Sequence, residues 1–258
     1  MAEDPRAKKL TEKHRVDQLR LASRVEADIR RLRPDLDVDD LSGSWRFRAH
    51  VNKIVEDGFS ESVEIAAQYM ERFPMLEAGV TETIIRPVYN PYLVELHTQS
   101  SGIAVAKRRI AQGATASEAT GPAVNALAAT VVQDVLAGGR SLIDSTVRYS
   151  GRAGGYRRVT DSKPCAFCAM LASRGPVYSQ ESAFFESHGH CGCSAEPVYR
   201  EWQPSELEWQ WRESYKHAAK KANKAGELRT AKGGRDTILW RMRRNSPELF
   251  SDGVFPKK

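Results

Sequence analysis

The four cysteines of this 258-residue chain constrain its fold more than any other feature, because all of them fall between positions 165 and 193. The first pair is a Cys-x2-Cys motif at Cys165 and Cys168, and a His-x-His-Cys-x-Cys motif follows at residues 188–193. Cys-x2-Cys is a zinc-ligand spacing, because a tight turn lets two thiolates reach one tetrahedral ion from the same side. The pattern therefore predicts a structural metal site.

The two motifs offer more ligands than a tetrahedral ion needs. We predict a structural Zn²⁺ held by Cys165, Cys168 and Cys191, with Cys193, His188 or His190 as the fourth ligand. Two disulfides are a weaker interpretation, since they belong to oxidising compartments and the chain opens on charged residues instead of an apolar signal segment. Plain buried thiols rank third. A catalytic metal ranks below structural zinc, because catalytic sites keep an open coordination position.

The net charge of +6 is concentrated at one end of the chain. Residues 1–202 hold 26 basic and 26 acidic side chains, whereas residues 203–258 hold 13 basic and 7 acidic ones. A neutral body with a basic tail indicates an acidic partner, although a solvated helix face is the more common reason for such a pattern. The candidate nucleic-acid contacts are Lys216, Lys220, Lys221, Lys224, Arg241, Arg243 and Arg244.

Most of the chain has a helical pattern. Apolar residues recur at helical spacing in residues 1–33, ending at Pro34, and in residues 41–73, with a bend near Gly58 and an end at Pro74. Segments rich in Ala, Leu and Val at residues 92–110 and 119–145 predict further helices.

Residues 156–160 and 195–199 have strand character, and residues 166–173 form a short helix between them. We therefore expect an α+β fold that is predominantly α-helical. It comprises a helical N-terminal domain at residues 1–150, a small zinc-stapled module with short strands at residues 151–202, and a basic helical tail at residues 203–258. The polar ending of the chain predicts a loose C-terminus.

The sequence lacks the signatures of several enzyme classes. Pro164 and the following Cys-x2-Cys match half of a zinc deaminase motif, but no His-x-Glu or Cys-x-Glu precedes them. Gly-x-Ser-x-Gly and His-Glu-x2-His are also absent. Lone histidines such as His97 are more often packed or surface residues than catalytic bases. We expect no catalytic residues, no small-molecule substrate and no membrane partner, since the apolar runs are shorter than a membrane span.

The cysteine region resembles a known family. The segment from Cys165 to Tyr178, the His-x2-Cys-x-Cys motif and the Pro197-Val198 exit are similar to the C-terminal domain of MuF-like phage minor head proteins, in the form found in phages of actinobacteria. The similarity covers about residues 140–200. It implies a minor capsid or head-morphogenesis protein of a tailed phage, located in the virion and, during assembly, in the host cytoplasm.

The same resemblance implies the partners. They are the portal protein, the major capsid protein and, through the basic tail, double-stranded DNA. Genes of this type neighbour or are fused to capsid maturation proteases. A maturation protease, or a zinc-dependent nuclease using His188 or His190, is therefore the alternative function.

Overall fold

The computed structural model describes residues 4–41, 43–176, 192–227 and 231–254. These residues fall into two compact units. The N-terminal unit comprises the chain up to Ser150 together with Gly192, and the C-terminal unit contains the remaining described residues from Gly151 onwards. Each unit has a hydrophobic core of its own.

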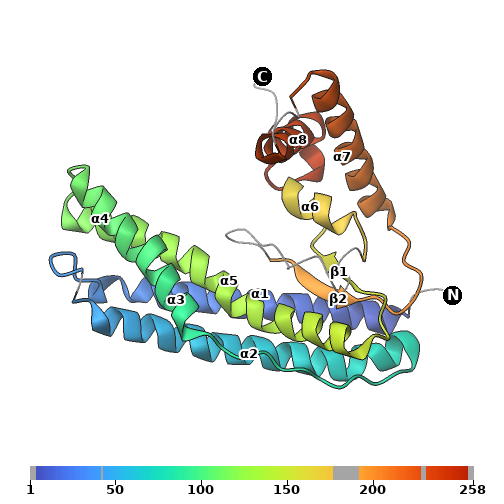
Figure 1. The fold of residues 1–258 in the computed structure, drawn as a ribbon, viewed down its shortest axis with the longest axis horizontal. Helices are drawn as coiled ribbons and strands as arrows, with labels where there is room; N and C mark the ends of the chain where they lie inside the picture. Colours follow the sequence, from blue (N-terminus) through green and yellow to red (C-terminus); the bar gives the residue numbers. More distant parts are fainter. Residues whose placement is uncertain (1–3, 42, 177–191, 228–230, 255–258) are drawn as a thin grey trace. The chain divides into compact units, whose positions relative to one another are not determined.

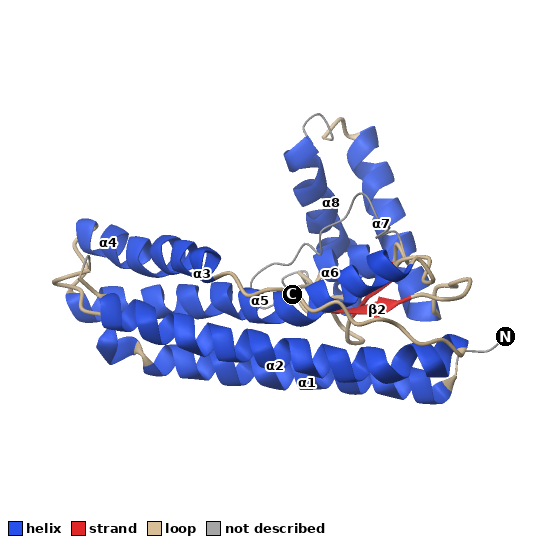
Figure 2. Ribbon diagram, turned by 60° about the horizontal axis from the view of Figure 1, so that its bottom comes forward, coloured by secondary structure: helices blue, strands red, loops and turns tan. Residues whose placement is uncertain are grey.

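The N-terminal unit is built on three long helices that lie side by side (Figures 1 and 2). They are α1 (Pro5–Arg31), α2 (Trp45–Ala78) and α5 (Ala116–Ser150). Their shared core contains fully buried Ile29, Phe47 and Leu127. By length and composition alone α5 is apolar enough to cross a membrane, but 67 % of its most apolar stretch is buried in the structure. It is the central helix of this bundle.

A buried polar cluster joins the three long helices. The Ser62 hydroxyl of α2 donates to Gln18 Oε1 of α1 at 2.8 Å, and the Gly139 amide of α5 donates to Ser62 Oγ at 3.0 Å. Gln18 Nε2 also donates to the Ser62 carbonyl at 2.9 Å. Because every group in this cluster has a partner, it fixes the alignment of the helices without leaving a buried polar atom unsatisfied.

A third layer of helix follows an extended segment after α2. It consists of α3 (Pro91–His97), the π-helical turn η2 (Thr98–Ile103) and α4 (Ala104–Ala111), which pack against α5. Asn90 begins α3 by accepting hydrogen bonds from the amides of Tyr92 and Leu93, which satisfies donors that have no partner inside the helix.

The C-terminal unit combines a two-stranded antiparallel sheet with three helices. The strands are β1 (Tyr156–Val159) and β2 (Ser194–Pro197). The helices are α6 (Ala166–Ala172), α7 (Glu206–Lys224) and α8 (Ala231–Asn245). Apolar side chains of α6 pack against both α7 and α8, so residues of the expected module and of the expected tail share one core.

The expected fold class is confirmed, since the chain is predominantly helical with one small sheet in its described part. One detail was wrong, because helix α2 does not end at Pro74 but continues to Ala78, where its C-cap Gly79 has a left-handed φ of 69°. Residues 45–78 form one continuous helix, so the helix is not broken at Gly58. Gly58 serves packing, because a Cβ there would lie 3.0 Å from Val25 and from Val135. The expected elements at residues 177–178 and 180–186 lie outside the described residues.

Candidate functional site

The segments that carry Cys165 and Cys193 leave and enter the two-stranded sheet at the same end. β1 leads through a turn to Cys165, and its last residue, Val159, pairs with Ser194 at the start of β2. Cys193 directly precedes Ser194. Because the strands are antiparallel, the chain leaves β1 and enters β2 at the same end of the sheet. Cys165 and Cys193, which lie 28 positions apart in the sequence, therefore follow and precede neighbouring strand ends.

The first motif forms a tight turn at the beginning of a helix. Cys165 is the N-cap of α6, and its Sγ accepts a hydrogen bond from the Cys168 amide at 3.4 Å. Cys168 and Cys193 are buried, and Cys165 is partly buried. A tight turn of this kind lets two cysteine sulfurs reach one ion from the same side. The turn thus suits a pair of zinc ligands.

The end of the chain packs onto this turn. The Ala166 amide donates to Asp252 Oδ1 at 2.9 Å, and the Ser251 amide donates to the Pro164 carbonyl at 2.9 Å. Phe250 has an exposed fraction of 1 % and lies in the core of the C-terminal unit. A buried aromatic ring and two hydrogen bonds therefore hold residues 250–252, where we expected a loose segment. The polar ending at residues 255–258, on which the expectation was based, lies outside the described residues.

The predicted metal ligands are only partly within the described residues. Cys165, Cys168 and Cys193 are described, whereas His188, His190 and Cys191 are not. Within residues 4–41, 43–176, 192–227 and 231–254, no group of three or more His, Cys, Asp or Glu side chains is placed to hold a metal ion. The complete set of thiolates and imidazoles is a zinc-type donor set. The site remains a prediction.

The predicted basic contacts divide into paired and exposed cations. Three have a carboxylate partner within 2.8 Å, namely Lys216 with Glu213, Arg241 with Glu227 and Arg243 with Asp252. No described carboxylate pairs with the exposed Lys220, Lys221 or Lys224. Arg244 lies over the ring of Trp240, with its Cζ 4.8 Å from the ring centroid. The remaining positive charge is therefore concentrated near the end of α7.

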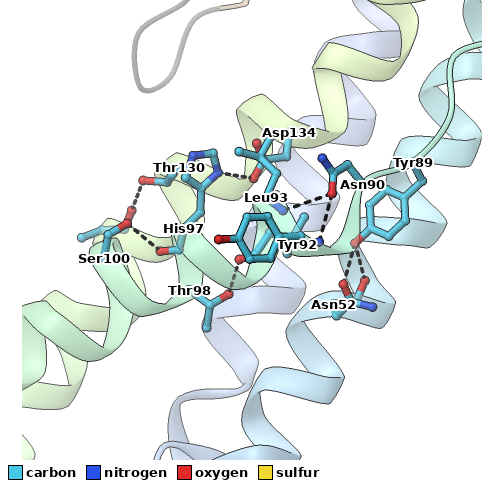
Figure 3. A network of polar contacts seen from close by, with 12 residues as sticks. Asn52, Tyr89, Asn90, Tyr92, Leu93, His97, Thr98, Ser100, Thr130 and Asp134 are labelled. Atoms are coloured by element: carbon cyan, nitrogen blue, oxygen red, sulfur yellow. Dashed lines mark hydrogen bonds and ion pairs between the residues drawn. The ribbon is translucent and has the colours of Figure 1, made fainter.

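A polar network in the N-terminal unit was not predicted from the sequence (Figure 3). His97 Nδ1 of α3 lies 2.8 Å from Asp134 Oδ2 of α5. Burial raises the pKa of the Asp134 carboxyl, and the hydrogen bond with His97 partly offsets this. The Tyr89 hydroxyl donates to Asn52 Oδ1 at 2.8 Å in the same network. No sequence motif joins His97 to a residue 37 positions away.

This network fastens α3 to the bundle. The neighbouring hydroxyls are not arranged as nucleophiles, since Ser100 Oγ donates to the His97 carbonyl and Thr130 Oγ1 donates to the Ala126 carbonyl. An activated hydroxyl would instead donate to the imidazole. The His97–Asp134 pair is therefore best explained as a charge-assisted contact between helices.

Comparison with protein-family models gives a match. The family model described as VG15 protein matches residues 5–218. This span includes the three long helices, both strands, α6 and most of α7. Neither the curated proteins nor the solved structures contain a match to the chain.

Proposed function

The chain belongs to the VG15 protein family, a family of phage proteins, and from this we propose that it is a minor capsid or head-morphogenesis protein of a tailed bacteriophage. The observation that carries the proposal is the family match over residues 5–218. The MuF-like cysteine pattern, which lies within that span, supports the more specific role in the head. In this proposal the protein resides in the virion, and in the host cytoplasm during assembly.

The role we propose is structural. A bundle of helices up to 35 residues long offers extended surfaces for docking to the portal protein and the major capsid protein. The His97–Asp134 pair holds two helices together and positions neither Ser100 nor Thr130 for attack. These features support binding more than catalysis.

A structural Zn²⁺ is part of this proposal. The ladder in the C-terminal unit has two strands of four residues each, and an isolated two-stranded sheet is marginally stable in water. Cys165, Cys168, Cys191 and either Cys193 or His188 would hold the ion where the strands meet. The ion would link the start of α6 to the start of β2 and so staple the ladder.

The proposed role is tested in the phage that encodes the chain. Proheads and DNA-filled virions are purified on density gradients, and their proteins are quantified by mass spectrometry. We expect the chain in both particles, in a fixed ratio to the portal protein. A phage that lacks the gene should produce fewer infectious particles, with infectivity restored by the chain supplied from a plasmid. Absence of the chain from both particles would refute the proposal.

Double-stranded DNA is the further partner that we propose, through Lys220, Lys221, Lys224 and Arg244. These cations lack a described carboxylate partner, in contrast to Lys216, Arg241 and Arg243. Phosphate contact by lysine and arginine is independent of base sequence and strongly dependent on salt. The proposal is therefore weak binding without sequence preference.

A further inference from the structure

We infer that the segment Phe250–Asp252 is a clamp that holds the Cys165–Cys168 turn in its metal-binding shape, with Asp252 as the positioning residue. The inference rests on the zinc site proposed above and adds a role for residues far from it in the sequence. Asp252 lies 86 residues after Ala166 in the sequence, and its carboxylate accepts a hydrogen bond from the Ala166 amide. The structure thus connects the end of the chain to the first pair of predicted ligands.

Two hydrogen bonds hold the backbone on either side of Cys165, and a buried ring anchors the segment that makes them. The Ser251 amide donates to the carbonyl of Pro164, the residue before Cys165, at 2.9 Å. The Ala166 amide, directly after Cys165, donates to Asp252 Oδ1 at 2.9 Å. Phe250, with an exposed fraction of 1 %, anchors the segment in the core beside α6. The backbone on both sides of the predicted ligand is therefore held by one short segment.

Asp252 supplements the cap of α6. Cys165 Sγ already accepts from the Cys168 amide, and the Asp252 carboxylate satisfies a second amide in the first turn. Amides of the first turn lack partners within their helix. Without Asp252, the Ala166 amide loses this acceptor, and the turn is held less firmly. A fixed turn keeps the two sulfurs spaced for one ion and lowers the ordering cost of binding.

The charge on Asp252 is balanced by Arg243. Arg243 Nε donates to Asp252 Oδ2 at 2.5 Å while Oδ1 faces the Ala166 amide. The guanidinium and the Ala166 amide together fix the orientation of the carboxylate. Arg243 therefore acts in this clamp instead of contacting nucleic acid.

The test compares full-length variants by zinc affinity. Wild-type protein, Asp252→Ala, Asp252→Asn and the control Asp236→Ala are titrated with Zn²⁺ against a chromophoric chelator of known affinity. Asp236 is an exposed residue of α8, so Asp236→Ala removes the same charge from another part of the C-terminal unit. Hydrogen exchange of the Ala166 amide is measured in parallel, and thermal unfolding reports whether each variant is folded.

We expect Asp252→Ala to weaken zinc binding roughly tenfold or more, as loss of an outer hydrogen-bond partner does at other metal sites. Exchange at the Ala166 amide should accelerate. Asp252→Asn retains an oxygen acceptor but loses the charge pair with Arg243, so its affinity should lie between those of Asp252→Ala and wild type. Asp236→Ala should match wild type in affinity and exchange.

The clamp is overturned if folded Asp252→Ala binds zinc as tightly as wild type. If Asp252→Ala does not fold, the decision passes to Asp252→Asn, and wild-type affinity in that variant overturns the clamp. If wild type binds no zinc, the zinc proposal fails independently of the clamp. In that case the clamp is tested by the rate at which iodoacetamide alkylates Cys165. This rate should rise in Asp252→Ala but not in Asp236→Ala. An unchanged rate in Asp252→Ala overturns the clamp.

Discussion

His14 is a neutral residue in the interior of the N-terminal unit. Its ring stacks on Tyr69 with centroids 4.5 Å apart, and no described residue forms a hydrogen bond to either ring nitrogen. Burial lowers the pKa of His14 from 6.5 to about 4. Ionisation of this side chain therefore opposes folding.

The pH dependence of stability should reveal this residue. Above pH 6.5 His14 is neutral in both states, and between pH 6.5 and about 4 mainly the unfolded chain takes up the proton. Stability should thus fall as the pH falls through this window, by at most about 1.4 kcal/mol per pH unit and roughly 3 kcal/mol in total. Urea unfolding of His14→Phe should lack this component. The exposed control, His50→Phe, should retain it, and equal pH profiles for wild type and His14→Phe would contradict the assignment.

Two glycines of α5 should respond differently to substitution by alanine. A Cβ on Gly139 would lie 2.9 Å from the Ser62 carbonyl and 2.5 Å from Gln18 Nε2, whereas the nearest atom to a Cβ on Gly121 is 3.5 Å away. Gly139→Ala should destabilise the bundle by about 1–3 kcal/mol through overpacking. Gly121→Ala should change stability by less than about 1 kcal/mol, because the higher helix propensity of alanine is opposed by crowding of its Cβ against the ring of the following Pro122. Denaturant unfolding measures both, and equal effects would refute the proposed close approach of α2 and α5.

At the scale of elements, Arg157 connects the sheet of the C-terminal unit to α7. Its Nε lies 2.6 Å from Glu196 Oε1 of β2, and its Nη1 lies 2.8 Å from Glu208 Oε1. Both carboxylates are largely buried. Glu208 also closes the capping box that begins α7 at Ser205. One guanidinium therefore neutralises two buried charges on different elements.

Removal of this bridge should be costly. Arg157→Met retains the bulk of the side chain but leaves Glu196 and Glu208 without their counter-charge, and loss of one partner of a buried ion pair costs about 3–5 kcal/mol. The exposed ion pair of Arg6 with Asp4 supplies a control, since Arg6→Met should leave stability nearly unchanged. Denaturant unfolding that gives both variants the same loss would contradict a buried bridge.

The elements were largely predictable because their signals are local. Helical periodicity located the long helices. Tyr156 and Val159 marked β1, whereas Val198 and Tyr199, which marked the second strand, lie just beyond the end of β2. Pro74 was misjudged as a helix end. It lies in the last turns of α2, and the helix continues to Ala78. There packing of the buried Pro74 and Phe73 outweighs the missing amide donor. Helix propensity read from the sequence does not include stabilisation by packing against other helices.

At the scale of the whole molecule, the unpredicted features are long-range. Nothing near Cys165 in the sequence indicates that Asp252 caps the helix after it, and nothing near His97 indicates Asp134. Similarly, the basic residues of α7 and α8 predicted a charged surface. The sequence did not indicate that the opposite faces of these helices, which carry Trp211, Ile238 and Met242, pack in a core with α6. Charge runs are visible in a sequence, but the partners that neutralise them depend on the fold.

The DNA proposal is best tested by charge reversal, because truncation of α7 and α8 would remove half of a core. Lys220→Glu/Lys221→Glu/Lys224→Glu should weaken binding and reduce the slope of log affinity against log salt by about 3, close to 0.9 for each lost phosphate contact. Lys8→Glu/Lys9→Glu/Lys107→Glu makes the same change in net charge on exposed residues elsewhere. Fluorescence anisotropy with labelled duplex DNA measures both. An equal loss in the two triple variants would indicate a net-charge effect alone.

The central claim is that one metal ion joins the two parts of the cysteine pattern. Elemental analysis of purified full-length protein measures this directly, with Cys165→Ser, His188→Ala, His190→Ala and Cys193→Ser analysed alongside wild type. The account predicts one zinc per chain in wild type, a clear loss in Cys165→Ser, and a loss in the variant that removes the fourth ligand. Folded wild-type protein that contains no stoichiometric metal would contradict it.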